Sequence, residues 1–224
     1  TVVGAVAGPP RVGRASRDDT AAARDRDAAV AAVAVLADAA VRRAVDRALR
    51  ERRTPPHFKA QAVSRALLLE ALDLARFAQN HKLTNPWRFH LLGKRSIEKV
   101  AALNARLVRE KFGDDAARKK LERWLSMPGW LVVTCRSSPE DTLRHQEDYA
   151  ACCCAVQNLA LALWARGVGL KWSTGDVIRH EEFHELLGVD PHAEYAIGLF
   201  WYGYPEGAAE STRTPLKDVL RELP

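Results

Sequence analysis

Two arginines and a threonine stand directly before a double proline, in the run Arg52-Arg53-Thr54-Pro55-Pro56. Guanidinium groups match the geometry of phosphate oxygens and keep their charge at physiological pH. The prolines restrict the backbone and so fix the direction in which the guanidiniums point. The chemistry indicated is phosphate binding. The alternative is a solvated arginine-rich helix end, which the helix dipole favours.

Two further stretches crowd polar side chains beside an aromatic one. The loop from Asn80 to Asn85 holds an imidazole, an ammonium, a hydroxyl and two amides, and Pro86-Trp87 closes it. It is either a binding loop or an ordinary polar connection. The stretch from Lys171 to Gly175 offers the flat indole of Trp172 and two hydroxyls. Read singly, that indole is a core side chain and the rest is a turn.

One apolar stretch must position these residues. From Tyr149 to Ala165 only Gln157 and Asn158 are strongly polar, which is typical of a helix buried on nearly every face. A membrane span needs about 20 apolar residues, and this run is shorter and interrupted. We therefore predict a central core helix that glycines end near Gly167, followed by a short strand at 170–174.

The remaining pattern predicts short strands among amphipathic helices. Strands are expected at 86–92, 130–135 and 194–204, and helices at 27–52, 62–78, 95–112, 115–125 and 180–187. Helices separated by short strands that do not alternate strictly indicate an α+β layer fold. We expect residues 1–25 to be a flexible tail and residues 26–224 to be a single domain.

Composition narrows the classes of function. The formal net charge is +6, but residues 1–60 hold twelve Lys and Arg against seven Asp and Glu, so the rest is nearly neutral. This distribution argues against a nucleic-acid partner. Cys135, Cys152, Cys153 and Cys154 are predicted to be free thiols, as expected in a reducing cytoplasm. We see no membrane anchor and no signal peptide, so the predicted location is cytoplasmic.

A competing motif lies at His180-Glu181-Glu182-Phe183-His184, which fits the His-Glu-x-x-His pattern of zinc hydrolases. The helix that carries it is only about two turns long before Gly188. His192 would be the third ligand, but its spacing misses the metzincin pattern. A short surface helix explains the same letters, and we predict no metal site.

The order and spacing of the motifs resemble those of the FMN-dependent nitroreductase family over residues 38–222. The resemblance is carried by Arg52-Arg53-Thr54, Asn85-Pro86-Trp87, Gly167-Val168-Gly169 and Gly203-Tyr204-Pro205. The loop Asn80-His81-Lys82 and the turn Trp172-Ser173-Thr174-Gly175 are most similar to the compact NAD(P)H nitroreductase subgroup. No single motif is specific, but their combination is.

The resemblance implies a role for each matching residue. Arg52, Arg53 and Thr54 would hold the phosphate and ribityl chain of FMN, together with Arg213. The isoalloxazine ring would lie against three further residues, Trp172, Ser173 and Thr174, while His81 and Asn85 would reach it from the partner chain. FMN would thus occupy a cleft between two subunits.

The family also implies a fold and an activity. The expected fold is a three-layer α+β sandwich with a mostly antiparallel sheet, present as a homodimer. The expected reaction takes a hydride from NAD(P)H and passes it to a small organic acceptor such as a nitroaromatic or a quinone, in ping-pong order. Flavin chemistry needs no protein acid, base or nucleophile, so no catalytic side chain is predicted. A flavin-binding protein without turnover is the alternative.

Two positions depart from the family pattern. Asn85 stands where glutamine is usual, and Pro56 stands where many members have a lysine near the flavin ring. The second change removes a cation that would stabilise reduced flavin. Lys82 or Lys171 could replace that charge, so the departure bears on the redox potential more than on FMN binding.

Overall fold

A computed structural model describes residues 38–207 and 209–224. The chain divides into two units, residues 1–47 and 48–224, and the sheet with its covering elements belongs to the second unit. Helix α2 (Ala39–Glu51) spans the boundary and buries none of its residues. The tail predicted at residues 1–25, and the predicted helix before residue 38, lie outside the described residues.

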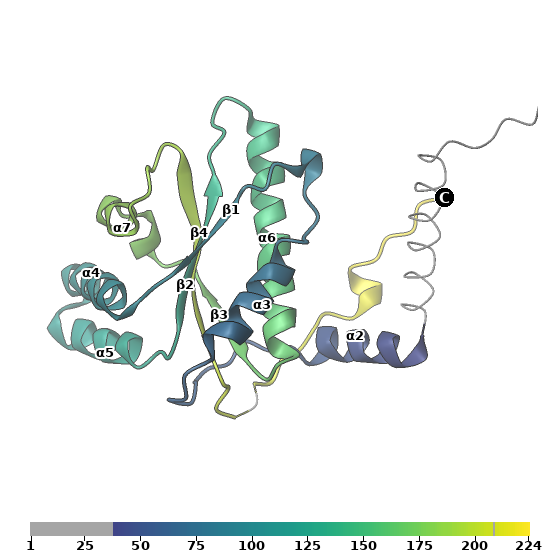
Figure 1. The fold of residues 1–224 in the computed structure, drawn as a ribbon, viewed down its shortest axis with the longest axis horizontal. Coiled ribbons are helices and arrows are strands. Elements are labelled where there is room, and N and C mark those ends of the chain that lie inside the picture. Colours follow the sequence, from purple (N-terminus) through teal and green to yellow (C-terminus); the bar gives the residue numbers. More distant parts are fainter. Residues whose placement is uncertain (1–37, 208) are drawn as a thin grey trace, which may run out of the picture. The chain divides into compact units, whose positions relative to one another are not determined.

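A four-stranded antiparallel sheet forms the middle layer, in the order β1-β2-β4-β3 (Figure 1). Its strands are β1 (Trp87–Leu91), β2 (Trp130–Arg136), β3 (Gly169–Ser173) and β4 (Glu194–Gly203). All four strands were predicted, and every predicted end lies within one residue of the observed end. The continuous apolar runs of β2 and β4 follow from burial on both faces, since helices cover both sides of the sheet.

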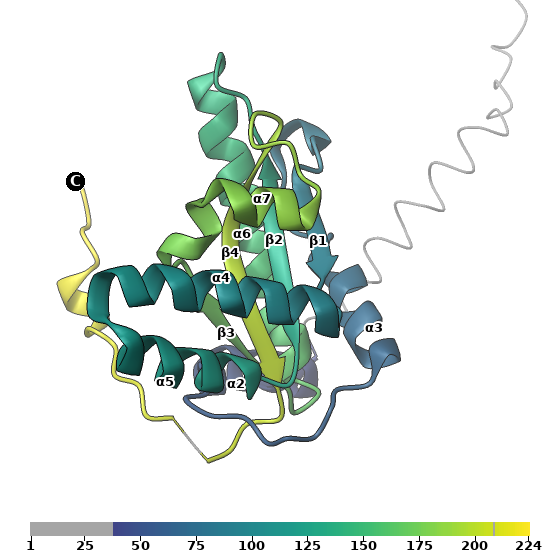
Figure 2. The ribbon, with the colours of Figure 1, turned by 90° about the vertical axis from the view of Figure 1, so that its left-hand side faces the viewer.

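Helices cover both faces of the sheet and complete three layers (Figures 1 and 2). Helices α3 (Arg65–Ala75) and α6 (Thr142–Trp164) pack against one face. Helices α4 (Lys94–Phe112), α5 (Asp114–Leu125) and α7 (Glu181–Leu187) cover the other, with the 3₁₀ turn η2 (Asp176–Arg179). The predicted three-layer α+β sandwich is therefore confirmed.

The central helix α6 differs from its prediction in two respects. It begins at Thr142, where the side chain of Asp141 caps it by accepting a hydrogen bond from Arg144 N (3.0 Å). It also buries only one side in the single chain. Tyr149 is 44% exposed, and Cys154 and Gln157 are exposed as well, so the prediction of burial on nearly every face is wrong for one subunit.

The two faces of the sheet have separate apolar cores. On the α3/α6 side, Leu131, Val133 and Phe200 pack with Leu159 and other residues of the central helix. On the α4/α5/α7 side, the rings of Trp124, Trp130 and Trp201 meet edge-on at centroid distances of 5.2–5.7 Å. No helix among the described residues has the length and apolarity required to cross a membrane.

Candidate functional site

Arginines from the two ends of the second unit converge on one cavity. Residues Leu49, Arg50, Arg53, Ser211 and Arg213 line a space of about 360 Å³. The guanidinium of Arg213 donates to Ser211 Oγ and to Thr212 O (2.8 Å). That of Arg53 donates to Arg50 O (2.5 Å) and to Arg52 O (3.0 Å). Backbone carbonyls and a hydroxyl thus orient both guanidiniums, and none of the described lining residues is acidic.

Arg52 belongs to the same cluster. Its pKa is lowered by burial first, and then by the positive charges of Arg213 and Arg53. Like charges held together favour an anion between them. The donor set is of a kind that fits a phosphate group, which is the role that the family resemblance implies for Arg52, Arg53 and Arg213. Exposed Thr54 follows Arg53 directly in the chain.

Strand β3 connects this arginine cluster to the predicted ring-binding turn. The strand begins at Gly169, where an added Cβ would lie 2.2 Å from Pro55 Cγ, so only glycine allows this approach to the residues that follow Arg53. The strand ends at Ser173, about 13 Å further along at the usual strand rise. The predicted phosphate clamp and the predicted ring wall thus lie near opposite ends of one strand.

Trp172 lies on the α3/α6 side of β3. Its indole N–H donates to Ile197 O (3.1 Å), and its ring centroid is 5.1 Å from that of Phe200. Gly198 makes room for it, since an added Cβ there would lie 2.1 Å from Trp172 Nε1. The side chain remains 38% exposed. The structure therefore presents a fixed, partly open aromatic face, in place of the fully buried core residue considered as the alternative.

Ser173 faces the opposite side of the sheet, because successive side chains alternate along a strand. It lines a cavity of about 180 Å³ with residues of α4 and α5. The carbonyl of Thr174 accepts from Arg179 Nη1 (3.1 Å). The side chains of Trp172, Ser173 and Thr174 therefore do not form one continuous wall. The alternation of side chains along a strand could have predicted this from the sequence.

The predicted polar loop has an unusual backbone. Lys82, Leu83 and Asn85 have φ values of 56°, 51° and 47°, which non-glycine residues seldom adopt. The side chain of Asn80 holds this shape, accepting from Asn85 N (2.7 Å) and donating to Thr84 Oγ1 (2.9 Å). The 3₁₀ turn η1 (His81–Leu83) lies within the loop.

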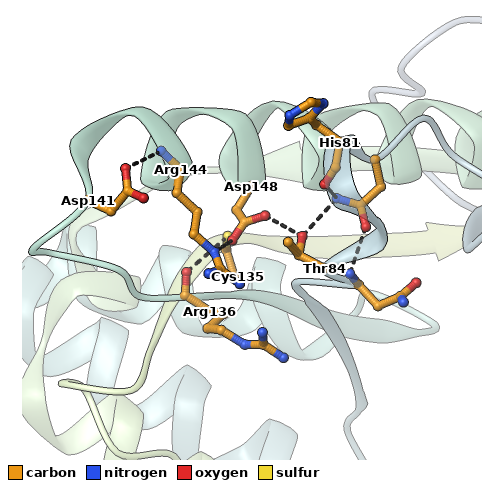
Figure 3. Close-up of polar contacts among 9 residues, drawn as sticks. His81, Thr84, Cys135, Arg136, Asp141, Arg144 and Asp148 are labelled. Carbon is orange, nitrogen blue, oxygen red and sulfur yellow. Dashed lines mark hydrogen bonds and ion pairs between the residues drawn. The ribbon is translucent and has the colours of Figure 1, made fainter.

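A buried carboxylate ties the loop to α6, as Figure 3 shows. Thr84 Oγ1 donates to Asp148 Oδ1, and Arg144 Nε lies 3.8 Å from Asp148 Oδ2. Asp148 is only 1% exposed, whereas His81 is exposed and its ring takes part in none of the contacts drawn. Sequence reasoning missed Asp148; its signal was a carboxylate at the start of an otherwise apolar helical run.

The loop and the β3 turn lie at opposite edges of the sheet. The loop leads into β1, and β1 and β3 are the two outer strands of the order β1-β2-β4-β3. Three strand spacings of about 4.8 Å separate them. Within one chain the sheet therefore keeps His81 and Asn85 apart from Trp172.

The His-Glu-x-x-His motif has structural roles in this fold. His180 is the N-terminal cap of α7, where its Nδ1 accepts from Glu182 N (3.3 Å). His184 is buried, with its Nδ1 3.1 Å from His180 O. No cluster of three possible metal ligands occurs in the part of the chain that the structure describes.

The fold and the order of these features define a class of protein. Comparison with known proteins identifies that class. The model of the nitroreductase family matches residues 49–204, and the chain belongs to this family. It is 29% identical over 180 residues to "Putative NAD(P)H nitroreductase YfhC" of Bacillus subtilis (strain 168), a match that covers 78% of this chain and 92% of that protein.

Solved structures agree with this assignment. The nitroreductase-like family protein from Bacillus cereus superposes with a TM-score of 0.71 at 32% identity, over 80% of this chain and 95% of that one. The FMN and NADPH-dependent nitroreductase NfnB from Sphigopyxis sp. strain HMH gives a TM-score of 0.66 at 17% identity, over 80% of this chain and 98% of that one. At that identity the second match speaks for the fold alone.

Proposed function

We propose that this protein is an FMN-dependent oxidoreductase that uses NAD(P)H to reduce a small organic acceptor, such as a nitroaromatic or a quinone, in ping-pong order. The observation that carries the proposal is the cluster of Arg52, Arg53 and Arg213, in which Arg53 and Arg213 line one cavity of phosphate-binding character. The name of YfhC supports the same chemistry, since it includes NAD(P)H nitroreductase activity.

In this proposal the chain's own residues bind and orient the cofactor. The guanidiniums of Arg52, Arg53 and Arg213 hold the phosphate, and the Thr54 hydroxyl meets the ribityl chain. The aromatic face of Trp172, with the Ser173–Thr174 backbone, positions the ring. Bound FMN supplies the hydride-accepting and hydride-donating chemistry, so the protein needs no acid, base or nucleophile of its own.

A homodimer completes the proposed site. His81 and Asn85 lie across the sheet from Trp172, so they serve as flavin contacts only for a second subunit. The exposed side of α6 offers a surface for that subunit, because Tyr149 and Cys154 remain open to solvent there. The rigid loop backbone would deliver His81 in a fixed geometry.

The free cysteines fit a cytoplasmic enzyme. Cys135, Cys152, Cys153 and Cys154 carry no disulfide in the structure. Unpaired thiols persist where the compartment is reducing.

An anaerobic titration of the purified protein tests the proposed activity. The protein as isolated should contain FMN, and NADH or NADPH should bleach its visible absorbance. Re-oxidation by a panel of nitroaromatics, quinones and enones would then identify the acceptor class. A flavin that neither nicotinamide reduces would show a flavin-binding protein without this turnover, and a protein that binds no flavin would refute the proposal.

A further inference from the structure

Three cations of α5 and β3 gather on the side of the sheet opposite α6. Lys120 and Arg123 are three residues apart on α5, so they share one face of the helix. Lys171 lies on β3 directly opposite Trp201 of β4. The rings of Trp201 and Trp124 are 5.2 Å apart, and Lys120 Nζ is 5.9 Å from the Trp124 centroid. The tryptophan contacts thus bring the cations of β3 and α5 together.

The positive charges in this cluster are not neutralised by ion pairs among the residues that the structure describes. None of the three cations forms a salt bridge to another described residue. Two carboxylates of the neighbouring segments, Glu122 and Asp176, are held by other cations. Burial, followed by the charges of Arg123 and Lys120, lowers the pKa of Lys171. An anion bound here would relieve this repulsion.

Two cavities give a ligand access to the cluster. Lys120 and Ser173 line the cavity of about 180 Å³. Arg123 and Lys59 line a second cavity of about 680 Å³, whose one acidic residue among the described lining is Glu206. Neither cavity shares a described lining residue with the arginine cluster that we assign to the FMN phosphate. This cluster is therefore a cationic centre separate from the arginine cluster.

We propose that Lys120, Arg123 and Lys171 bind the phosphate groups of the nicotinamide dinucleotide. The inference rests on the proposed function, because it places the dinucleotide beside the flavin. Ser173 joins the two, since it belongs to the predicted ring-binding turn and also lines the cavity of Lys120. A dinucleotide carries its pyrophosphate, and in NADPH a 2′-phosphate, away from its reacting ring. A second cationic centre, on the other face of the outer strand β3 from Trp172, suits this separation.

A binding measurement on the FMN-loaded dimer tests the inference without turnover. Isothermal titration with adenosine 2′,5′-bisphosphate and with AMP would compare wild type, the double variant Lys120→Gln/Arg123→Gln and the single variant Lys171→Gln. We expect the double variant to bind at least one probe on the order of tenfold more weakly, through loss of charge-assisted hydrogen bonds. Lys119→Gln removes an exposed charge of the same helix and should change nothing.

Steady-state kinetics then identify the phosphate that is recognised. A rise in KM for NADPH alone assigns the cluster to the 2′-phosphate, and equal rises for NADPH and NADH assign it to the pyrophosphate. Unchanged probe binding and unchanged KM in the double variant would overturn the inference and leave the proposed function intact. Loss of FMN in place of a KM effect would also overturn it. If neither nicotinamide reduces the wild-type flavin, the proposed function itself fails.

Discussion

At the scale of single residues, the arginine cluster is the feature with the clearest chemical consequence. Arg52 and Arg213 are remote in sequence, yet each contributes a positive charge to the same small volume. Such an arrangement destabilises the empty protein and becomes favourable when a dianion is bound. Burial and the neighbouring charges of Arg213 and Arg53 lower the pKa of Arg52. Guanidinium groups nevertheless keep their charge in proteins.

Removing one guanidinium should therefore weaken FMN binding. Arg52→Ala and Arg213→Ala are each expected to cost about 1.5–3 kcal/mol of binding free energy, which is roughly a 10- to 100-fold rise in Kd. Titration of the deflavinated protein by flavin fluorescence measures this. Arg221→Ala removes an exposed guanidinium near the C-terminus as a control. Equal FMN affinity in wild type and both variants would remove the phosphate assignment.

Gly198 is the residue that allows Trp172 its position. The substitution Gly198→Ala puts a methyl group 2.1 Å from the indole nitrogen of Trp172, so the ring must move and give up its hydrogen bond to Ile197 O. We expect a loss of about 1–3 kcal/mol in the free energy of unfolding, measured by urea denaturation, and weaker FMN binding. The matched control is Gly93→Ala, where nothing lies within 4 Å of the added Cβ.

At the scale of elements, the loop between α3 and β1 is held by few but specific contacts. Its left-handed residues are stabilised by Asn80 within the loop and by Asp148 from α6. Backbone strain of this kind persists only where the surroundings enforce it, and it is often found at binding sites. The carboxylate of Asp148 thus helps to hold the loop that carries His81.

The substitution Thr84→Val should release this loop while keeping side-chain shape. The hydrogen bond to Asp148 is lost and the carboxylate loses a donor, so we expect a destabilisation of about 1–3 kcal/mol. Amide hydrogen exchange should increase at residues 80–85 more than in β2 or β4. Thr142→Val, at the exposed start of α6, serves as the control. Uniform exchange across the loop and the sheet would contradict a local positioning role.

At the scale of the whole molecule, one subunit holds the parts of the proposed site at two edges of the sheet. The β1 edge carries His81 and Asn85, and the β3 edge carries Trp172. The helix between these features in sequence, α6, buries one side against the sheet and leaves Tyr149 and Cys154 exposed. Both observations are explained if two chains pair through α6 and each supplies the loop to the other's cofactor.

A charge on the open side of α6 should disrupt this pairing. Cys154→Arg is expected to shift the protein from dimer to monomer, because a guanidinium cannot be buried without a partner. Light scattering coupled to size exclusion measures the mass, and FMN content should fall in parallel. Leu125→Arg introduces the same charge at an exposed leucine of α5 and should leave the dimer intact. A wild-type monomer that retains FMN would refute the shared site.

The sequence by itself determined the elements and the local chemistry. Periodicity located the strands and helices of the sandwich, because burial on one or both faces leaves its imprint on apolar spacing. Two motifs could be found in the sequence because the residues of each are neighbours along the chain: Arg52-Arg53-Thr54 before two prolines, and the polar loop before Trp87. The motif at His180–His184 was equally visible locally, but the structure uses its histidines to cap and pack a short helix.

The tertiary structure alone decided which distant residues meet. It brought Arg213 to Arg52, and placed Lys120 and Arg123 beside Lys171 through packing of α5 on the sheet. It also made Asp148 the anchor of a loop that lies 64 residues earlier in the chain at Thr84. Such pairings depend on long-range packing, which local spacing does not encode. The same packing left one side of α6 open, where apolar composition alone had predicted burial on nearly every face.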